Sequence, residues 1–312
     1  MARVVFMGTP SFAVPALQAL DGRHEVVGVV TQPDRPAGRG RQLRSSPVKE
    51  EALARGLPVF QPGTLRTPEA VARLAGWRPD LIAVAAFGQI LQTPVLALPP
   101  HGCLNVHASL LPRYRGAAPI SAAILAGDAA TGVTIMRMDE GMDTGPILVQ
   151  AGCPISSDDT TGSLTVKLAR LGAGLLADIL PGWLGGEVQE RPQDDSAATY
   201  CRPLQVEDGH LDWRRPAAEL DRRVRACIPW PGAYTTWQGT RLKVLEARPW
   251  AAWAGAGAPG EVVALEPEGI GVVTGQGALE LLEVQLAGKK PMAAGVFARG
   301  QRELVGGTLG SS

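Results

Sequence analysis

Residues 81–87 have the sequence LIAVAAF, in which no side chain is polar. A strand of a one-sided sheet alternates apolar and polar side chains, whereas a strand of a parallel sheet is covered on both faces and is apolar throughout. The run is also far shorter than the roughly 20 residues that a membrane-spanning helix needs. We therefore expect residues 81–87 to form a central, fully covered strand of a parallel sheet.

Shorter apolar runs and helix-like segments alternate before and after this strand. The predicted strands are residues 4–7, 26–30, 57–60, 103–107, 133–138 and 147–153. The predicted helices are residues 11–20, 120–126 and 164–179. This alternation is typical of a mostly parallel sheet with right-handed crossover connections. The sequence thus predicts an α/β fold with a doubly wound sheet.

The pattern changes near residue 181, and six of the seven tryptophans lie beyond residue 180. Residues 182–206 are polar and interrupted by glycine and proline, which is typical of a linker. Beyond this segment, a helix is expected at residues 217–228 and short strands at residues 234–238, 242–246, 261–265, 270–274 and 279–286. Short strands with turns between them favour a small OB-type β-barrel. We therefore expect domains at residues 1–181 and 207–312.

The composition excludes several classes of protein. Lys and Arg number 30, as do Asp and Glu, so the zero net charge of the 312-residue chain excludes a uniformly basic nucleic-acid binder. Hydrophobic residues make up 45%, which argues against a disordered chain. The four cysteines and four histidines show no metal-ligand spacing, so we expect reduced thiols and no metal. The N-terminal sequence lacks the features of a signal peptide, and a cytoplasmic location is expected.

Two polar residues stand on the otherwise apolar strand predicted at residues 103–107. Asn105 and His107 are two positions apart, so their side chains point to the same face of a strand. In an open parallel sheet, ligands bind beyond the carboxyl ends of the strands, which is where His107 is expected. An amide beside an imidazole at this point is a candidate catalytic pair. A buried histidine beside a structural asparagine is the alternative.

A glycine-rich acidic loop, MDEGMDTGP at residues 138–146, joins two predicted strands. Asp143 on such a loop can approach His107, orient its ring and stabilise its protonated form. An amide that stabilises an oxyanion, an imidazole that carries a proton and a carboxylate suit acyl-type group transfer without a covalent intermediate. The sequence contains no Ser or Cys in a nucleophile-elbow motif. A loop-capping role for Asp143 on the surface is the alternative.

Basic residues gather in two stretches of this neutral chain. Residues 31–49 carry five cations and one acid, and are predicted to form a long loop near the strand ends. Residues 213–250 carry eight cations and three acids, and Lys289 and Lys290 follow. Such runs are usually solvated faces. Basic faces on both domains are nevertheless what a polyanionic substrate such as RNA requires.

Residues 109–120, SLLPRYRGAAPI, with Asn105 and His107 before them, resemble the signature of the 10-formyltetrahydrofolate-dependent formyltransferase family. Further matches are GTP at residues 8–10, TQPDRPAGRG at 31–40, GVTIM at 132–136 and AGKK at 287–290. The resemblance runs from residue 3 to about residue 305 and is strongest to the members that formylate a tRNA. Ala108 and Tyr114 lie in variable positions of the signature.

The resemblance implies a Rossmann-like formyltransferase domain followed by an OB-type domain that binds tRNA. The implied activity is transfer of a formyl group from 10-formyltetrahydrofolate to the α-amino group of methionine on initiator methionyl-tRNA, for translation initiation. Asn105, His107 and Asp143 would be the catalytic residues. The resemblance implies no metal, no membrane and no obligate protein partner, and we expect a monomer.

The resemblance also implies which residues contact the two substrates. The formyl donor is expected to contact Phe87, Gly88, Gln89, Ser109, Leu110, Leu111, Pro112, Asp139, Glu140 and Gly141. The tRNA is expected to contact Arg35, Arg39, Arg41, Arg44, Arg222, Arg225, Lys289 and Lys290, with most weight on Arg39.

Other functions share part of these features. A formyltransferase for a small amine, such as glycinamide ribonucleotide or an amino-sugar nucleotide, would share the catalytic residues without needing the basic loop. A formyltetrahydrofolate hydrolase would use water at the same site. The intact catalytic residues argue against a non-catalytic RNA-binding protein. The missing glycine fingerprint argues against an NAD-dependent enzyme.

Overall fold

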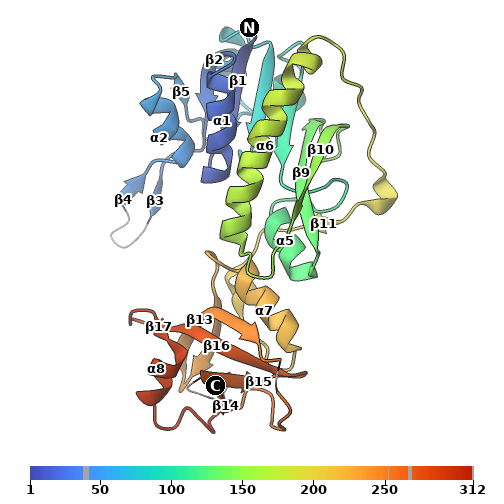
Figure 1. Cartoon of the computed structure of the whole chain (residues 1–312). Helices are drawn as coiled ribbons and strands as arrows, with labels where there is room; N and C mark the ends of the chain where they lie inside the picture. The colour runs from blue at the N-terminus through green and yellow to red at the C-terminus, as the bar shows by residue number, and fades with distance from the viewer. Residues whose placement is uncertain (38–41, 252, 266–268, 311–312) are drawn as a thin grey trace. The chain divides into compact units, whose positions relative to one another are not determined.

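The fold of the chain is given by a computed structural model that describes residues 1–37, 42–251, 253–265 and 269–310 (Figure 1). The chain divides into two compact units, each built from separate parts of the sequence. The first unit comprises Met1–Pro119, Ala130–Pro154 and Thr165–Cys201, and the second comprises Ile120–Ala129, Ile155–Leu164 and Arg202–Ser312. Each unit is described separately.

A seven-stranded sheet forms the centre of the first unit, with the strand order β10-β9-β7-β6-β1-β2-β5. Its strands are β1 (Arg3–Gly8), β2 (Glu25–Val30), β5 (Val59–Phe60), β6 (Leu81–Ala85), β7 (Cys103–His107), β9 (Ala130–Arg137) and β10 (Ile147–Pro154). Strands β7, β6, β1, β2 and β5 pair in parallel. Strand β9 is antiparallel to β7, and β10 to β9. The predicted α/β class with a mostly parallel, Rossmann-like sheet is confirmed.

The central strand β6 matches the apolar run that predicted it, since all five residues of Leu81–Ala85 are buried. It ends two residues earlier than expected. Ala86 has a positive φ of 46°, which lies outside the β region, so the chain turns away from the sheet there. This turn follows the carboxyl end of the strand, where ligands bind in open α/β sheets.

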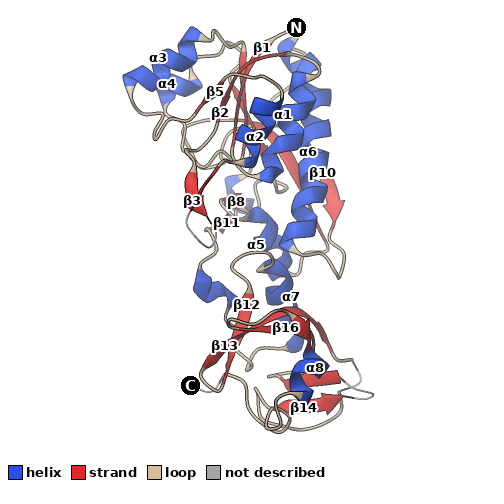
Figure 2. Cartoon of the chain, turned by 90° about the vertical axis from the view of Figure 1, so that its left-hand side faces the viewer, coloured by secondary structure: helices blue, strands red, loops and turns tan. Residues whose placement is uncertain are grey.

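Helices cover both faces of this sheet, with α1 and α6 on one face and α3 and α4 on the other (Figure 1, Figure 2). Leu74 of α3 joins Ile82 of β6 in one core cluster. On the opposite face, α6 approaches the sheet closely at Gly172, where a Cβ would lie 2.6 Å from Val106 Cγ1. The helices of this unit are η1 (Ser11–Ala13, a 3-10 turn), α1 (Val14–Asp21), α2 (Pro47–Ala54), α3 (Pro68–Gly76), α4 (Thr93–Leu96) and α6 (Thr161–Leu184).

The structure differs from the long loop predicted at residues 31–49. Arg35–Ala37 (β3) and Gln42–Arg44 (β4) pair as an antiparallel hairpin. Helix α2 begins shortly after it, and the Ser46 side chain caps this helix by accepting a hydrogen bond from the Lys49 N–H. Short paired strands without an apolar face leave no hydrophobic period in the sequence, which is why the prediction missed them.

Residues 182–206, expected to be a linker, are attached to the first unit as far as Cys201. Helix α6 continues to Leu184. Arg191 and Ile147 exchange backbone hydrogen bonds of 2.8 and 2.9 Å. After the 3-10 turn η2 (Asp195–Ala197), Tyr200–Cys201 (β11) pairs in parallel with Arg115–Gly116 (β8). This segment therefore reaches the loop that follows β7.

The second unit contains an antiparallel sheet with the order β12-β13-β16-β15-β14, and β17 pairs with β16. The predicted β-rich C-terminal domain is confirmed at this level. Leu220 and Val224 of α7, which are four positions apart and therefore share one face of the helix, are buried in the core of this unit. The remaining elements are α5 (Pro119–Ala126), η3 (Val206–Gly209), α7 (Ala217–Ala226), β12 (Ala233–Trp237), β13 (Thr240–Pro249), β14 (Val262–Leu265), β15 (Gly269–Val273), β16 (Ala278–Leu286), β17 (Met292–Ala293) and α8 (Ala294–Arg299). Across the described residues of both units, the structure has no helix with the length and apolar character that crossing a membrane requires.

Candidate active site

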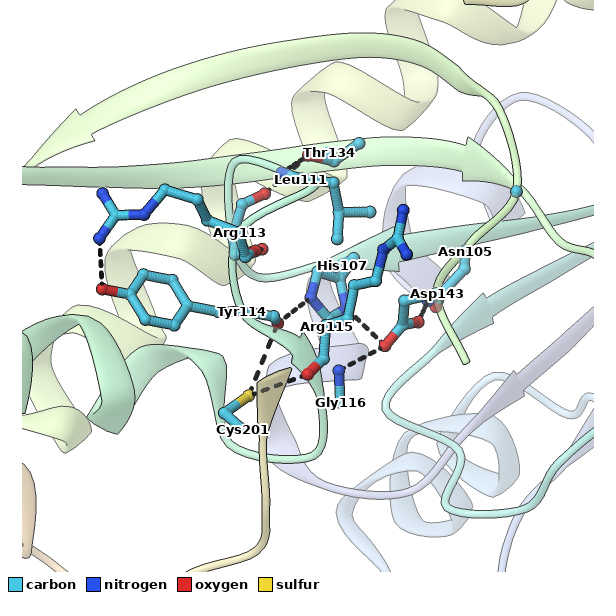
Figure 3. Close-up of polar contacts among 12 residues, drawn as sticks. Asn105, His107, Leu111, Arg113, Tyr114, Arg115, Gly116, Thr134, Asp143 and Cys201 are labelled. Carbon is cyan, nitrogen blue, oxygen red and sulfur yellow. Dashed lines mark hydrogen bonds and ion pairs between the residues drawn. The ribbon is translucent and has the colours of Figure 1, made fainter. Parts of the chain in front are cut away.

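The carboxyl end of β7 carries the predicted pair of polar residues. Asn105 and His107 are only 9% and 5% exposed, in a strand whose every residue is buried. Strand β7 lies between β6 and β9, so its end is held on both sides. The loop from β9 to β10, residues 138–146, passes this end and brings Asp143 to it (Figure 3).

Asp143 contacts both of these side chains and a backbone amide. Asn105 Nδ2 donates to Asp143 Oδ1 at 3.3 Å. Asp143 Oδ2 accepts from the N–H of Gly116 at 2.8 Å and lies 3.6 Å from His107 Nδ1. The structure therefore brings the three residues together. A capping role on the surface does not fit the Asp143 side chain, which is 16% exposed.

His107 lies between two oxygen atoms (Figure 3). Its Nε2 is 2.9 Å from the carbonyl oxygen of Tyr114, and its Nδ1 faces the Asp143 carboxylate. A carbonyl oxygen only accepts hydrogen bonds, so Nε2 donates to Tyr114, whereas Nδ1, at 3.6 Å, is within ion-pair distance of the carboxylate. The ring is thereby oriented from two sides.

The backbone of Asp143 has a φ of 55°, a left-handed conformation that costs a non-glycine residue roughly 1–2 kcal/mol. Gln193 supports this conformation. Its Nε2 donates to the carbonyl oxygens of Asp143 and Gly145 at 2.8 and 2.7 Å. Its Oε1 accepts from Nε and Nη2 of Arg115 at 3.1 and 2.9 Å. A side chain from residues 182–206 therefore holds the loop that carries Asp143.

Arg115 is 2% exposed although it is charged. Besides Gln193, it donates to Asp195 Oδ1 at 2.7 Å and to the Tyr200 hydroxyl at 3.3 Å. Burial by itself lowers the pKa of Arg115, but the hydrogen bonds to Asp195 and Tyr200 outweigh burial and raise the pKa above its ordinary value. A permanently charged guanidinium is thus enclosed beside the loop after β7.

Residues 109–112, predicted to contact the formyl donor, form a loop that is fixed from within. Ser109 and Leu111 are buried, and Ser109 Oγ donates to the carbonyl oxygen of Arg113 at 2.6 Å. Thr134 Oγ1 of β9 donates to the carbonyl oxygen of Ser109 at 2.7 Å and accepts from the Leu111 N–H at 3.1 Å. Leu110 and Pro112 are half-buried. The side chains of Ser109 and Leu111 therefore shape this loop.

The turn after β6 carries three further residues predicted to contact the donor. The Phe87 side chain is 2% exposed and belongs to the core. The Phe87 carbonyl oxygen accepts from Thr9 Oγ1 at 3.0 Å. Gln89 Oε1 accepts from the Leu65 N–H at 3.0 Å. Phe87 and Gln89 thus fix the turn, whereas Gly88 is exposed, with a positive φ of 86°.

Asp139, Glu140 and Gly141, the last residues predicted to contact the donor, are exposed on the loop that carries Asp143. Asp139 Oδ1 accepts from the Gly141 N–H at 3.0 Å and from Thr144 Oγ1 at 2.7 Å. Thr93 of α4 donates to the Glu140 carboxylate. These contacts order the first half of the loop.

Four of the residues predicted to bind tRNA are exposed. Arg35 and Arg44 lie on the β3–β4 hairpin, and Lys289 and Lys290 lie in the turn before β17. Arg39 and Arg41 lie outside the described residues.

Arg222 and Arg225 of α7 have partners within the second unit instead. Arg225 is paired with Asp221 at 2.9 Å, where the two side chains are 15% and 13% exposed. Arg225 also donates to the carbonyl oxygen of Asp159 at 3.0 Å. Arg222 Nε donates to the carbonyl oxygen of Leu125 at 3.3 Å. This geometry favours packing roles for both arginines over contact with a phosphate.

The sequence did not predict four residues that hold the site in place: Arg115, Thr134, Gln150 and Gln193. Gln150 Nε2 donates to the Leu111 carbonyl oxygen and to Thr134 Oγ1, both at 2.9 Å. Arg115 lies within SLLPRYRGAAPI and Thr134 within GVTIM, so their place in these motifs was a usable signal. Gln150 and Gln193 belong to no motif. Within the described ranges, no group of three His, Cys, Asp or Glu could hold a metal ion.

Known protein families match both parts of the chain. The formyl transferase family matches residues 2–180, and the formyl transferase C-terminal domain matches residues 203–302. The chain is 51% identical over 300 residues to the methionyl-tRNA formyltransferase of Chloroflexus aggregans, which covers 96% of this chain and 97% of that protein. It is 50% identical over 300 residues to the methionyl-tRNA formyltransferase of Myxococcus xanthus, with coverage of 96% and 95%.

A solved structure of an N-formyltransferase has a fold similar to that of this chain. The N-formyltransferase of Helicobacter canadensis, in complex with folinic acid and dTDP-3-aminofucose, has a TM-score of 0.68 and 19% identity, and covers 90% of this chain and 99% of its own. At this identity, the likeness concerns the fold alone. The match of both domains and the identity to relatives over nearly their whole length show that the chain belongs to the methionyl-tRNA formyltransferase family of formyl transferases.

Proposed function

We propose that the chain transfers a formyl group from 10-formyltetrahydrofolate to the α-amino group of methionine on initiator methionyl-tRNA. The product, formylmethionyl-tRNA, serves translation initiation. The observation that carries the proposal is the meeting of Asn105, His107 and Asp143 at the carboxyl end of β7. The names of the relatives, 51% and 50% identical over nearly the whole chain, support the same reaction.

The three residues suit attack of an amine on a formyl carbon. A model α-amine has a pKa of about 7.7–8.0, so part of the methionyl amine is neutral near pH 7. Asn105 has a second N–H besides the one given to Asp143, and this N–H stabilises the oxygen of the tetrahedral intermediate. Protonated His107 stabilises the same oxygen, while Asp143 orients His107 and assists proton transfer to the departing folate nitrogen. Positioning contributes more than a strong base here.

The formyl donor is a cosubstrate that would bind beside these residues, at the loops 87–89, 109–112 and 139–141. The buried side chains of Phe87, Ser109 and Leu111 shape these loops. The pterin ring is therefore expected to meet backbone groups. Gly88 suits such a contact, because it is exposed and has no side chain to shield its backbone.

The tRNA would bind the β3–β4 hairpin and a second basic surface. The hairpin offers Arg35 and Arg44, with Arg39 and Arg41 between them in the sequence. In the C-terminal domain, residues 207–312, Lys289 and Lys290 would supply the second basic surface. We propose that this domain is an OB-type barrel. Residues 1–181 would be the catalytic domain. The activity is assigned to a monomeric, cytoplasmic chain without an obligate protein partner.

The test is a formylation assay with the purified full chain and 10-formyltetrahydrofolate. Methionine-charged initiator tRNA is compared with charged elongator tRNA, uncharged tRNA and free methionine as acceptors. Transfer to the charged initiator tRNA alone supports the proposal. Turnover of the folate without formylated tRNA would contradict it and would point to a small amine or water as the acceptor.

A further inference from the structure

We propose that Gln193 and Arg115 are positioning residues for Asp143. Residues 191–201 would then hold the catalytic loop, residues 138–146, in addition to connecting the two domains. This inference rests on the proposed function, in which Asp143 takes part in catalysis. Gln193 lies 50 residues from Asp143 in the sequence and Arg115 lies 78 residues from Gln193, yet hydrogen bonds join all three.

The amide of Gln193 has only one orientation that satisfies its partners. An arginine side chain only donates hydrogen bonds, and a carbonyl oxygen only accepts them. Oε1 of Gln193 therefore faces Arg115, and its Nε2 faces the carbonyl oxygens of Asp143 and Gly145. The reverse orientation would set donors against donors and an acceptor against acceptors. The side chain thus links Arg115 to the Asp143 loop in one fixed geometry.

Residues 115 and 116 hold both the main chain and the side chain of Asp143. The Gly116 N–H donates to the Asp143 carboxylate at 2.8 Å. The Arg115 guanidinium acts through Gln193 on the main chain of Asp143. The carboxylate lies 3.3 Å from Asn105 Nδ2, just beyond the usual range of hydrogen-bond lengths, and 3.6 Å from His107 Nδ1, which is an ion-pair distance. A small displacement of the loop would therefore break these contacts.

The segment that supplies Gln193 is itself anchored to the loop after β7. The Arg115 N–H donates to the Thr199 carbonyl oxygen at 2.8 Å, and the Ala117 N–H donates to the Cys201 carbonyl oxygen at 3.0 Å. Within residues 191–197, Gln193 is the one residue that is not exposed. An otherwise solvated segment thus turns a single side chain inward, onto the catalytic loop.

Gln193→Met tests the inference, because it keeps the length of the side chain and removes its hydrogen bonds. We expect kcat for formylation to fall about 10–100-fold, while KM for the formyl donor and for charged tRNA changes less than about threefold. Gln193→Glu keeps the acceptor for Arg115 and lacks the two donors, so its loss should be similar. Gln18→Met is the matched control, since the side chain of this exposed glutamine of α1 donates to Glu51 and should leave kcat unchanged when it is replaced.

A role that acts through Asp143 predicts a specific double-mutant result. In an Asp143→Ala background the carboxylate is absent, so adding Gln193→Met should change kcat by less than about twofold. An equal fall in both backgrounds would overturn the proposal, because Gln193 would then act on something other than Asp143.

Amide hydrogen exchange tests the same inference without turnover. Residues 138–146 and the Gly116 amide should exchange faster in Gln193→Met than in the wild type and in Gln18→Met. Unchanged exchange at these amides would overturn the positioning role, whatever the activity. The two proposals are therefore separable: a wild-type chain that formylates no tRNA contradicts the proposed function, whereas the exchange comparison still decides on Gln193.

Discussion

Asn105 donates a hydrogen bond to Asp143, from Nδ2 to Oδ1 across 3.3 Å. This bond sets the orientation of the amide, with the nitrogen rather than the oxygen toward the carboxylate. Because Asn105 is only 9% exposed, its amide has little freedom once this orientation is set. The second N–H of Nδ2 then has a fixed direction, which is what a preorganised donor to an oxyanion requires.

Asn105→Ala is expected to lower kcat by about 10²–10³-fold, or about 2.7–4 kcal/mol in the activation barrier. The KM for charged tRNA should change little, because the lost interaction is strongest in the transition state. Steady-state kinetics at saturating donor measure this effect, with the melting temperature as a check on folding. A variant with nearly wild-type kcat would show that Asn105 is not the donor.

Gly116→Ala should disturb both the β8–β11 pair and the carboxylate of Asp143. Gly116 has a φ of 115°, and a Cβ there would lie 2.4 Å from the carbonyl oxygen of Cys201. The matched control is Gly56→Ala, because Gly56 also has a positive φ, 69°, and open space around it. Gly56→Ala should cost roughly 1–2 kcal/mol in unfolding free energy from backbone strain alone, with kcat unchanged. Gly116→Ala should lose more stability in urea titrations and should also lower kcat, and equal behaviour of the two variants would contradict this contact.

Arg44→Gln should weaken the binding of charged tRNA in a salt-dependent way. Arg44 is exposed on the β3–β4 hairpin, where a phosphate can reach it. Each phosphate contact that is lost should reduce the slope of log K against log salt by about 0.7–0.9. Fluorescence anisotropy between 50 and 200 mM salt measures the slope, with Arg66→Gln, another exposed arginine, as the control. A slope equal to that of the wild type would remove Arg44 from the tRNA surface.

Arg225→Met should lower the stability of the fold and leave tRNA binding unchanged. The change leaves Asp221, whose side chain is 13% exposed, without its charged partner and removes a donor to the Asp159 carbonyl oxygen. A loss of about 2 kcal/mol in unfolding free energy is expected. The tRNA affinity and its salt slope should match those of the wild type. A reduced slope with unchanged stability would restore the phosphate-binding role.

The sequence predicts the sheet and the place of the candidate catalytic residues for a clear physical reason. A strand covered on both faces must be apolar, as Leu81–Ala85 is, and residues two apart on a strand share a face, as Asn105 and His107 do. The carboxyl ends of parallel strands gather at one edge of the sheet. An acidic loop at that edge was therefore a sound candidate for the third residue, and the structure brings Asp143 to both partners.

The supporting residues could not be predicted in this way. Gln193 lies in a polar segment without hydrophobic period, and its role depends on Arg115, 78 residues away. The inward turn of Ser109 depends on Arg113 and on Thr134 of the neighbouring strand. Arg225 was expected to contact the tRNA, but it is paired with the Asp221 carboxylate four residues before it. Such side-chain pairs depend on the folded backbone, which no local pattern reports.

Two buried thiols should make the unfolding free energy depend on pH above neutrality. Burial raises the pKa of Cys103 from 9.0 to about 12, and burial is also the main reason that the pKa of Cys227 rises from 9.0 to about 11. In the unfolded chain both thiols ionise near pH 9, whereas in the folded chain they remain protonated until the pH approaches the raised values. The stabilisation is therefore complete below pH 9 and is lost as the pH rises from about 9 toward 11–12.

At pH 10 each thiol should lower the unfolding free energy by about 1.4 kcal/mol relative to pH 8. Urea titrations at pH 8 and pH 10 measure the difference for the wild type, for Cys103→Ala and for Cys227→Ala. Each variant loses some stability at both pH values because it leaves a cavity, so the comparison uses only the change between the two pH values. That change should be smaller by about 1.4 kcal/mol in each variant than in the wild type. Equal pH dependence in all three proteins would mean that the two thiols titrate in the folded chain as they do in the unfolded one.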